Sequence, residues 1–96
     1  MIITVAIVLK TYASILQGSL SYAEADRWAW DRIQLFDQGK LAFEPPEQET
    51  LIWTLLSYLY GLDMPTVADR TETMISKEDI LDFLRRNKVY DEVRRL

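Results

Sequence analysis

The sequence predicts an all-α fold, a compact bundle of four to five helices that forms a single domain over residues 1–96. Three observations predict it. Apolar residues recur at helical spacing in several separate segments. Two serine-led capping boxes, at Ser21 and Ser76, mark helix starts. Isolated glycines such as Gly18 and Gly61 stand where these segments end. An apolar fraction of 49% and a charged fraction of 27% are typical of a globular domain with one modest core.

The first helix is expected over roughly 3–17 and ends at Gly18, a natural residue for the position after a helix. The β-branched residues between positions 2 and 8 are also typical of a strand, so a strand remains the alternative there. The helix is the preferred interpretation because one apolar face recurs at helical spacing. That face comprises Val5, Val8, Leu9, Tyr12, Ile15 and Leu16.

The second helix is expected from Tyr22 to about Leu35. The Ser21 hydroxyl can accept from the backbone N–H of Glu24, and the Glu24 carboxylate can accept from that of Ser21. Trp30 lies outside the buried stripe of this helix, in a mostly polar stretch. We expect it to pack under the 37–44 segment, with a protein interface as the alternative. The predicted buried stripe comprises Tyr22, Ala25, Trp28, Ala29, Ile33 and Phe36.

Residues 37–46 read as a connector, because a glycine and a proline pair break regular structure. A third helix is expected from Pro46 to Gly61, since proline is favoured in a first helical turn. It is apolar nearly all round, which predicts the central helix, with Trp53 in the core.

Residues 62–75 read as a loop that precedes the last helices. The capping box at Ser76 begins a fourth helix that ends near Asn87. Its inward face is expected to carry Ile80, Phe83 and Leu84. Residues 88–96 are expected to form a short basic amphipathic turn or helix.

The absence of histidine and cysteine bears most strongly on function. Histidine is the usual proton-transfer residue near neutral pH, and both residues are the commonest ligands of zinc. Carboxylate pairs are the remaining catalytic option, but each acid falls at a cap, in a first turn or on a polar face. The isolated glycines form no phosphate-cradling loop. We therefore expect a binding protein and no enzyme, with no catalytic residue, no cofactor and no metal.

Charge is distributed unevenly along the chain. The formal net charge is −4 and the sequence pI is about 4.7, which argues against nucleic acid as a direct partner. Residues 85–96 nevertheless carry five of the eleven basic residues. These cations are expected to complement helix dipoles, and contact with nucleic acid or an acidic partner is the alternative. The acidic remainder of the chain predicts a basic protein partner.

Acidic residues at connector and loop positions, together with Trp30, form the candidate contact surface, because binding residues concentrate at such positions. A solvated acidic surface without a partner is the alternative interpretation. The candidate partner-binding residues are Trp30, Glu44, Glu47, Glu49, Asp63, Asp69 and Glu72.

The apolar run from Met1 to Leu9 is interpreted as part of the core. The first charge, Lys10, follows the run, whereas a signal peptide begins with positive charge. The run is also much shorter than the roughly 20 residues of a membrane-spanning helix. We expect a cytoplasmic protein with no membrane partner. The apolar N-terminus suits a core or a dimer contact, so both a monomer and a homodimer remain open.

Three segments together resemble small bacterial immunity proteins of polymorphic and contact-dependent growth inhibition toxin systems. They are LQGSLSYAEADRWA at residues 16–29, LIWTLL at 51–56 and SKEDILDFL at 76–84. The chain departs from the pattern at Pro45 and Pro46 and at Arg32, where a second aromatic residue is expected, and 85–96 lies outside it.

The resemblance implies a cytoplasmic antidote. Such a protein binds a cognate toxin domain, often a nuclease, and occludes its active site or its substrate path without catalysis. No contact residue is carried over from the family. The alternative function is that of a small helical adaptor or regulatory subunit that binds a host protein.

Overall fold

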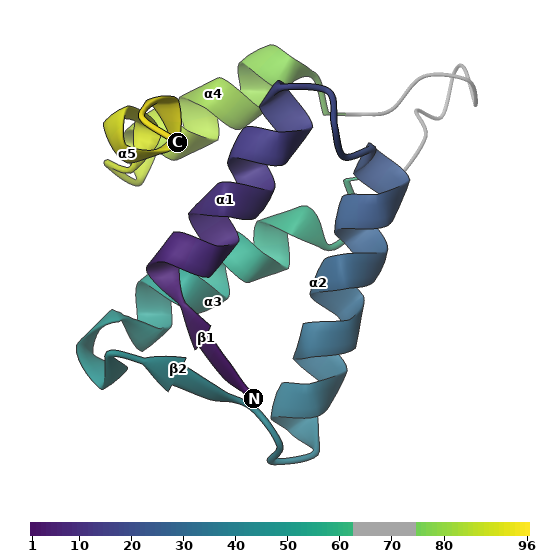
Figure 1. The fold of residues 1–96 in the computed structure, drawn as a ribbon, viewed down its shortest axis with the longest axis vertical. Coiled ribbons are helices and arrows are strands. Elements are labelled where there is room, and N and C mark those ends of the chain that lie inside the picture. Colours follow the sequence, from purple (N-terminus) through teal and green to yellow (C-terminus); the bar gives the residue numbers. More distant parts are fainter. Residues whose placement is uncertain (63–74) are drawn as a thin grey trace.

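A computed structural model describes residues 1–62 and 75–96 of the chain and is mostly helical. Within the described ranges, five α-helices are accompanied by a two-stranded sheet and one short 3-10 helix, which agrees with the expected four to five helices, whereas the fold is not purely α-helical. The elements follow one another as labelled in Figure 1. They are β1 (Ile2–Thr4), α1 (Val5–Leu16), α2 (Tyr22–Asp37), β2 (Ala42–Glu44), η1 (Pro46–Gln48), α3 (Glu49–Leu59), α4 (Lys77–Arg86) and α5 (Tyr90–Arg94).

The sheet corrects the expectation of a helix from residue 3. β1 pairs with β2 in parallel, with Ile3 opposite Phe43, and both of these side chains are buried. Helix α1 begins only at Val5, where the Thr4 hydroxyl accepts from the backbone N–H of Ile7 at 3.2 Å. The strand forms because β2 returns to this edge after two helices, and the N-terminal pattern alone contains no sign of that partner.

The helix ends follow the predicted capping chemistry. Both hydrogen bonds of the Ser21–Glu24 capping box are present at 3.1 Å, and the Ser76–Asp79 box is complete as well. Gly18 has a φ of +81° and its N–H donates to the Ile15 carbonyl, which ends α1. The predicted starts of α2 and α4 are therefore confirmed.

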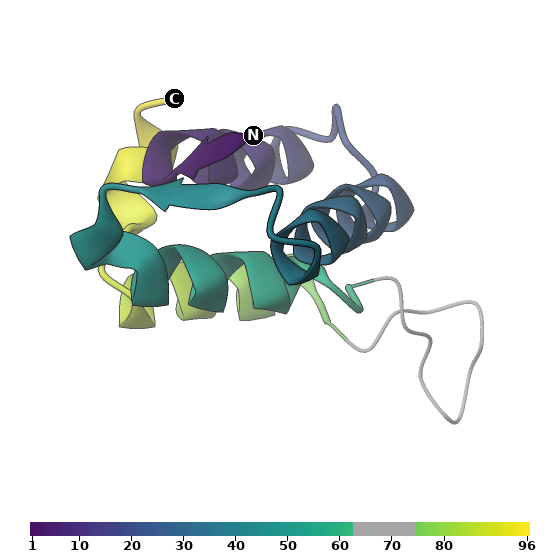
Figure 2. The same cartoon turned by 90° about the horizontal axis from the view of Figure 1, so that it is seen from below.

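The helices form two layers. In Figure 2, α1 and the sheet lie above α3 and α4, while α2 closes one side and α5 the other. The Tyr12 hydroxyl donates to the Leu55 carbonyl at 2.6 Å and joins α1 to α3 inside the core. Burial raises the pKa of the Tyr12 phenol well above its usual value. The fully buried side chains include Val8, Tyr12, Ile15, Ile52, Leu55, Leu56, Leu59, Leu62, Ile80 and Leu84.

Helix α3 is buried on one face only, which corrects two core predictions. Trp53 and Phe36 are each 36% exposed, although both were expected inside. Within residues 1–62 and 75–96, the other elements pack against one face of α3, and the opposite face, which carries Trp53, stays open to solvent. Trp28 is partly buried at the edge of the core.

Within the described residues, none of the helices combines the length and the apolar character needed to cross a membrane.

Candidate partner-binding surface

Trp30 projects from α2 and stacks on Tyr60, the residue that follows α3. Their ring centroids are 5.2 Å apart and the planes are inclined by 20°. Trp30 is 42% exposed and Tyr60 is 51% exposed. The contact is therefore with the end of α3 and not with the 37–44 segment, where packing was expected. The two rings support one another while both face solvent.

A backbone contact holds this pair in place. The Asp26 carboxylate accepts a hydrogen bond from the N–H of Gly61 at 2.6 Å. Gly61 has a φ of +96°, a conformation that glycine adopts without the steric cost of a side chain. Because Asp26 is one turn before Trp30 and Gly61 follows Tyr60, this bond fixes the end of α3 beside α2 and brings the two rings together.

A second aromatic group lies further along the same two helices. Phe36 of α2 contacts Trp53 of α3 with a centroid distance of 5.1 Å, and it stacks on Phe43 of β2 at 5.3 Å. Phe43 is buried, so it supports the two exposed rings from below. The sheet thereby anchors this part of the surface to the core.

Both aromatic groups join α2 to α3, at successive points along the two helices. Position 30 pairs with 60, and position 36 pairs with 53. Trp53 and Tyr60 are seven residues apart, close to two helical turns, which puts them on one side of α3 about 10 Å apart. We call Trp30, Phe36, Trp53 and Tyr60 the aromatic strip.

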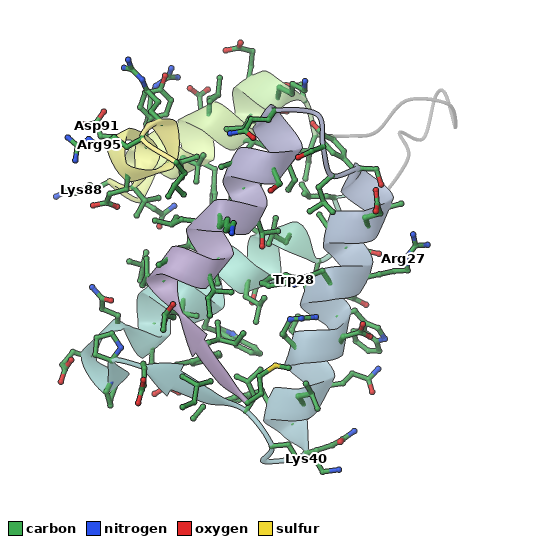
Figure 3. The ribbon with its side chains drawn as sticks, in the orientation of Figure 1. Arg27, Trp28, Lys40, Lys88, Asp91 and Arg95 are labelled. Atoms are coloured by element: carbon green, nitrogen blue, oxygen red, sulfur yellow. The ribbon has the colours of Figure 1, made fainter. Side chains whose placement is uncertain are left out.

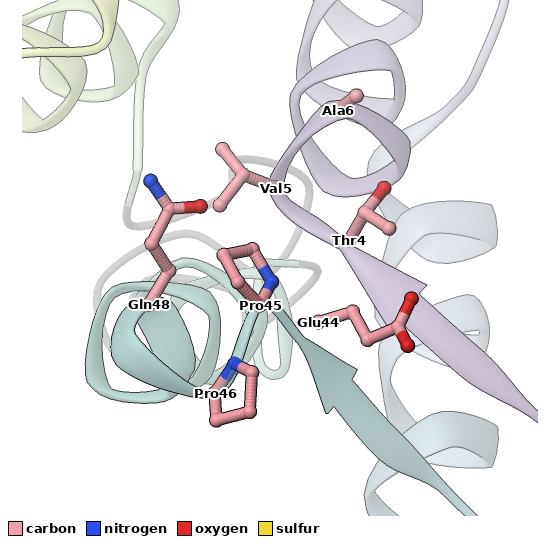
Figure 4. A pocket seen from close by; sticks show the side chains of 7 residues that line it. All are labelled: Thr4, Val5, Ala6, Glu44, Pro45, Pro46 and Gln48. Carbon is pink, nitrogen blue, oxygen red and sulfur yellow. The ribbon is translucent and has the colours of Figure 1, made fainter.

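The predicted acidic residues divide between two places. Glu49 precedes Trp53 by four residues, so it lies on the same side of α3 and extends the aromatic strip. Glu44 adjoins Phe43 in β2, and neighbouring residues of a strand point to opposite faces. It lines a separate open depression of about 450 Å³ together with Thr4, Val5, Ala6, Pro45, Pro46 and Gln48 (Figure 4).

The structure therefore brings Trp30 and Glu49 to one surface and puts Glu44 on another. Glu47 is exposed in η1. Asp63, Asp69 and Glu72 lie outside the described residues.

Sequence reasoning did not find Phe36, Trp53 and Tyr60 as surface residues. A signal was present in α3, since the side that carries Trp53 and Tyr60 also carries the charged Glu49. A stripe that includes a carboxylate is typical of a solvent-facing side. For Phe36 we find no such signal, because its spacing matches the buried stripe of α2.

Arg32 and Trp28 occupy another part of α2. The Arg32 guanidinium lies 4.4 Å from the Trp28 ring centroid, and one of its Nη atoms donates to the Trp28 carbonyl at 3.2 Å. Burial lowers the pKa of Arg32, and the nearby Asp31 carboxylate raises it by a smaller amount. This pair covers the Trp28 ring and explains why that tryptophan is less exposed than Trp30.

The α4–α5 corner differs from the aromatic strip in charge. Figure 3 labels Lys88 and Arg95 beside α5, on the opposite side of the molecule from Arg27 on α2. Arg85 and Arg94 lie against the Tyr90 ring, 4.6 and 5.8 Å from its centroid. We call Arg85, Arg86, Lys88, Arg94 and Arg95 the basic end.

Among the residues described, no three acidic side chains stand close enough together to form a metal site. The aromatic strip and its neighbouring carboxylate suit contact with a large partner, because exposed tryptophan and tyrosine often anchor protein interfaces. No protein-family model matches the chain, and neither a curated protein nor a solved structure matches it.

Proposed function

We propose that this protein is an immunity protein, which binds a basic cognate toxin domain, such as a nuclease, and neutralises it by occlusion without catalysis. The observation that carries the proposal is the solvent-facing stack of Trp30 on Tyr60, together with the exposed Phe36–Trp53 contact between the same two helices. Large aromatic side chains in this exposed state are the commonest anchors of tight protein interfaces.

The aromatic strip has the rigidity that tight binding needs. Each exposed ring contacts another ring, and Asp26 ties the backbone of α3 to α2. Rings that are already ordered lose little side-chain entropy when a partner covers them. A preformed surface of this kind supports affinity without a conformational change.

Charge supports a basic partner. Glu49 extends the aromatic strip at one end, and the exposed Asp37 directly follows Phe36 at the end of α2. The chain as a whole is acidic, with a formal charge of −4. Complementary charge accelerates encounter with a basic toxin and disfavours acidic competitors.

The choice of a toxin as the partner rests on the resemblance of residues 16–29, 51–56 and 76–84 to immunity proteins. The second of these segments contains Trp53, and the first contains Asp26, whose carboxylate holds the end of α3 beside α2. The other three residues of the aromatic strip lie outside the three segments. The surface itself would equally suit a host protein, and the experiment below separates the two.

The test is a growth assay in which the product of the gene directly upstream is expressed alone and with this chain. We expect killing by the upstream product, protection by this chain, and co-purification of the two proteins. Trp30→Ala and Glu49→Lys should abolish protection at low expression. Glu44→Lys is the matched control, because it makes the same charge change on a different surface and should still protect.

Two results would count against the proposal. A non-toxic neighbour would favour an adaptor that binds a host protein. Loss of protection in the Glu44→Lys control, with Trp30→Ala fully protective, would move the contact from the aromatic strip to the depression beside β2.

A further inference from the structure

The basic end is unusual within an acidic protein. Five of the eleven lysines and arginines fall between Arg85, near the end of α4, and Arg95, which directly follows α5. The acidic side chains nearest in the sequence are Asp82 on α4 and Asp91 and Glu92 on α5. Net charge here is positive even when these three are counted, whereas the remainder of the chain is negative.

Most of these cations lack an acidic partner within the part of the chain that the structure describes. The single ion pair there joins Arg85 to Asp82 at 3.2 Å, and both side chains are half-exposed or more. Arg86 reaches only a backbone carbonyl, that of Asp82, at 3.5 Å. Ion pairing within the protein therefore does not explain why these cations lie together at the basic end.

Tyr90 orients two of the guanidinium groups. Arg85 and Arg94 both lie near its ring centroid, at 4.6 and 5.8 Å. A guanidinium held against a ring keeps N–H groups along its edge that can donate in pairs to an oxyanion. Ordering of this kind lowers the entropy lost when an anion binds.

Lys88 occupies a backbone position that does not favour lysine. Its φ is +62°, directly after the Asn87 cap of α4, where helices most often have glycine. The Lys88 N–H donates to the Arg85 carbonyl, and the Val89 N–H donates to the Leu84 carbonyl, so the turn itself is well formed. Glycine would make the same turn without strain, so the lysine side chain must be explained by something other than the turn.

Two open depressions lie between these side chains. One, of about 380 Å³, is lined by Arg85, Lys88, Tyr90 and Asp91. The other, of about 320 Å³, is lined by Asp91, Arg94 and Arg95. Asp91 lines both depressions, so an anion bound in either one would meet two cations and one carboxylate.

We propose that the basic end binds the phosphodiester backbone of nucleic acid, at a site separate from the aromatic strip. Nucleic acid presents phosphates at regular short spacing along each strand, so one strand can contact several of these cations at once. The overall negative charge keeps this binding weak and non-specific, which agrees with the argument against nucleic acid as the main partner. The proposal does not depend on the identity or existence of a toxin.

The test is fluorescence anisotropy with a labelled oligothymidine strand of about 20 nucleotides, titrated with the whole chain over a range of salt concentrations. We expect a Kd on the order of 10⁻⁵ M at low salt. If about four phosphates are neutralised, log Kd should change with log salt with a slope of magnitude about 3.

Lys88→Gly is the decisive variant, because it removes a cation and also relieves backbone strain. We expect several-fold weaker binding and a smaller salt slope, with a Tm equal to or above that of the parent chain. A loss of binding in this variant cannot arise from unfolding. Arg95→Ala should behave in the same way, and Lys10→Ala, which removes an exposed cation from α1, is the control that should bind like the parent.

Three results would overturn the proposal. One is the absence of binding at protein concentrations up to about 10⁻⁴ M, the weak limit of non-specific nucleic-acid binding. Another is an equal loss of affinity in Lys10→Ala. The third is displacement of the strand by polyglutamate as efficient as displacement by unlabelled oligothymidine, which would indicate a surface for acidic proteins.

Discussion

The aromatic strip consists of aromatic rings and the basic end of lysine and arginine side chains, and the two surfaces are held in place by different interactions. In the aromatic strip, each exposed ring rests on another ring, and the Asp26–Gly61 hydrogen bond ties the supporting helices together. At the basic end, long cationic side chains extend from α4 and α5 with one ion pair among the described residues. Binding by the first surface depends on buried apolar area, which salt affects little, whereas binding by the second is screened within about 10 Å at 0.1 M salt.

Both surfaces rest on the same core, so we expect the largest loss of stability from a substitution in that core. Leu55 is fully buried in α3, and its carbonyl accepts the Tyr12 hydroxyl. Leu55→Ala should lower the free energy of unfolding by about 2–5 kcal/mol, because a cavity replaces packed side-chain atoms. Urea denaturation followed by tryptophan fluorescence and by far-UV circular dichroism measures this loss.

The same experiment tests whether the two surfaces are independent units. We expect one cooperative transition with both probes, since α1 and α3 link the two sides. Ile7→Ala, at a position 41% exposed on α1, is the control and should change stability by no more than about 0.5 kcal/mol. Two separate transitions in Leu55→Ala would show that the surfaces belong to separately stable parts.

A substitution at Asp26 should disturb the aromatic strip and leave the basic end unchanged. Asp26→Ala removes the acceptor of the Gly61 N–H, so we expect a loss of about 1–2 kcal/mol in the free energy of unfolding. The Trp30 ring should also become more accessible to a soluble fluorescence quencher, because Tyr60 is no longer held beside it. Asp31→Ala on the same helix is the control. Equal quenching in both variants would mean that the hydrogen bond does not position the rings.

A substitution at Lys88 is the corresponding test at the basic end, and here we expect the free energy of unfolding to rise. Lys88→Gly should raise the free energy of unfolding by about 0.5–1 kcal/mol, because glycine adopts a positive φ without a steric cost. Lys88→Ala removes the same charge and keeps the strained conformation, so it should bring no gain. If alanine stabilises as much as glycine, charge repulsion and not backbone strain limits this corner.

The smallest expected effect is a pH dependence of stability that comes from the capping box of α2, the helix that carries Trp30 and Phe36. Hydrogen bonds from the backbone and the hydroxyl of Ser21 hold the pKa of Glu24 below its usual value. A lowered folded-state pKa means that the capping box stabilises α2 above the pKa of the unfolded chain, and that this contribution is lost as the pH falls through the folded-state pKa. Glu24→Gln should flatten the dependence of Tm on pH between about pH 3 and pH 6. An unchanged profile would assign the acid sensitivity to other carboxylates.

Local chemistry made much of the helical fold predictable. The hydroxyl and carboxylate of each capping box lie within one turn of each other, and the boxes at Ser21 and Ser76 begin α2 and α4 as expected. The apolar face of α1 was also correct, because helical spacing repeats within the segment itself. These features need no information from distant parts of the chain.

The sequence alone also determined the charge contrast between the basic end and the rest of the chain, and the absence of histidine and cysteine. Only the tertiary structure decided which apolar residues remain exposed. Phe36 matches the buried stripe of α2, and Trp53 lies on a helix that is apolar nearly all round, but within the described residues no further helix covers the junction of α2 and α3. The β1–β2 pair was decided in the same way, since a strand needs a partner that the chain supplies only after two helices have folded back. Burial and strand pairing depend on which segments meet in space, whereas caps and helical spacing depend on neighbours in the chain.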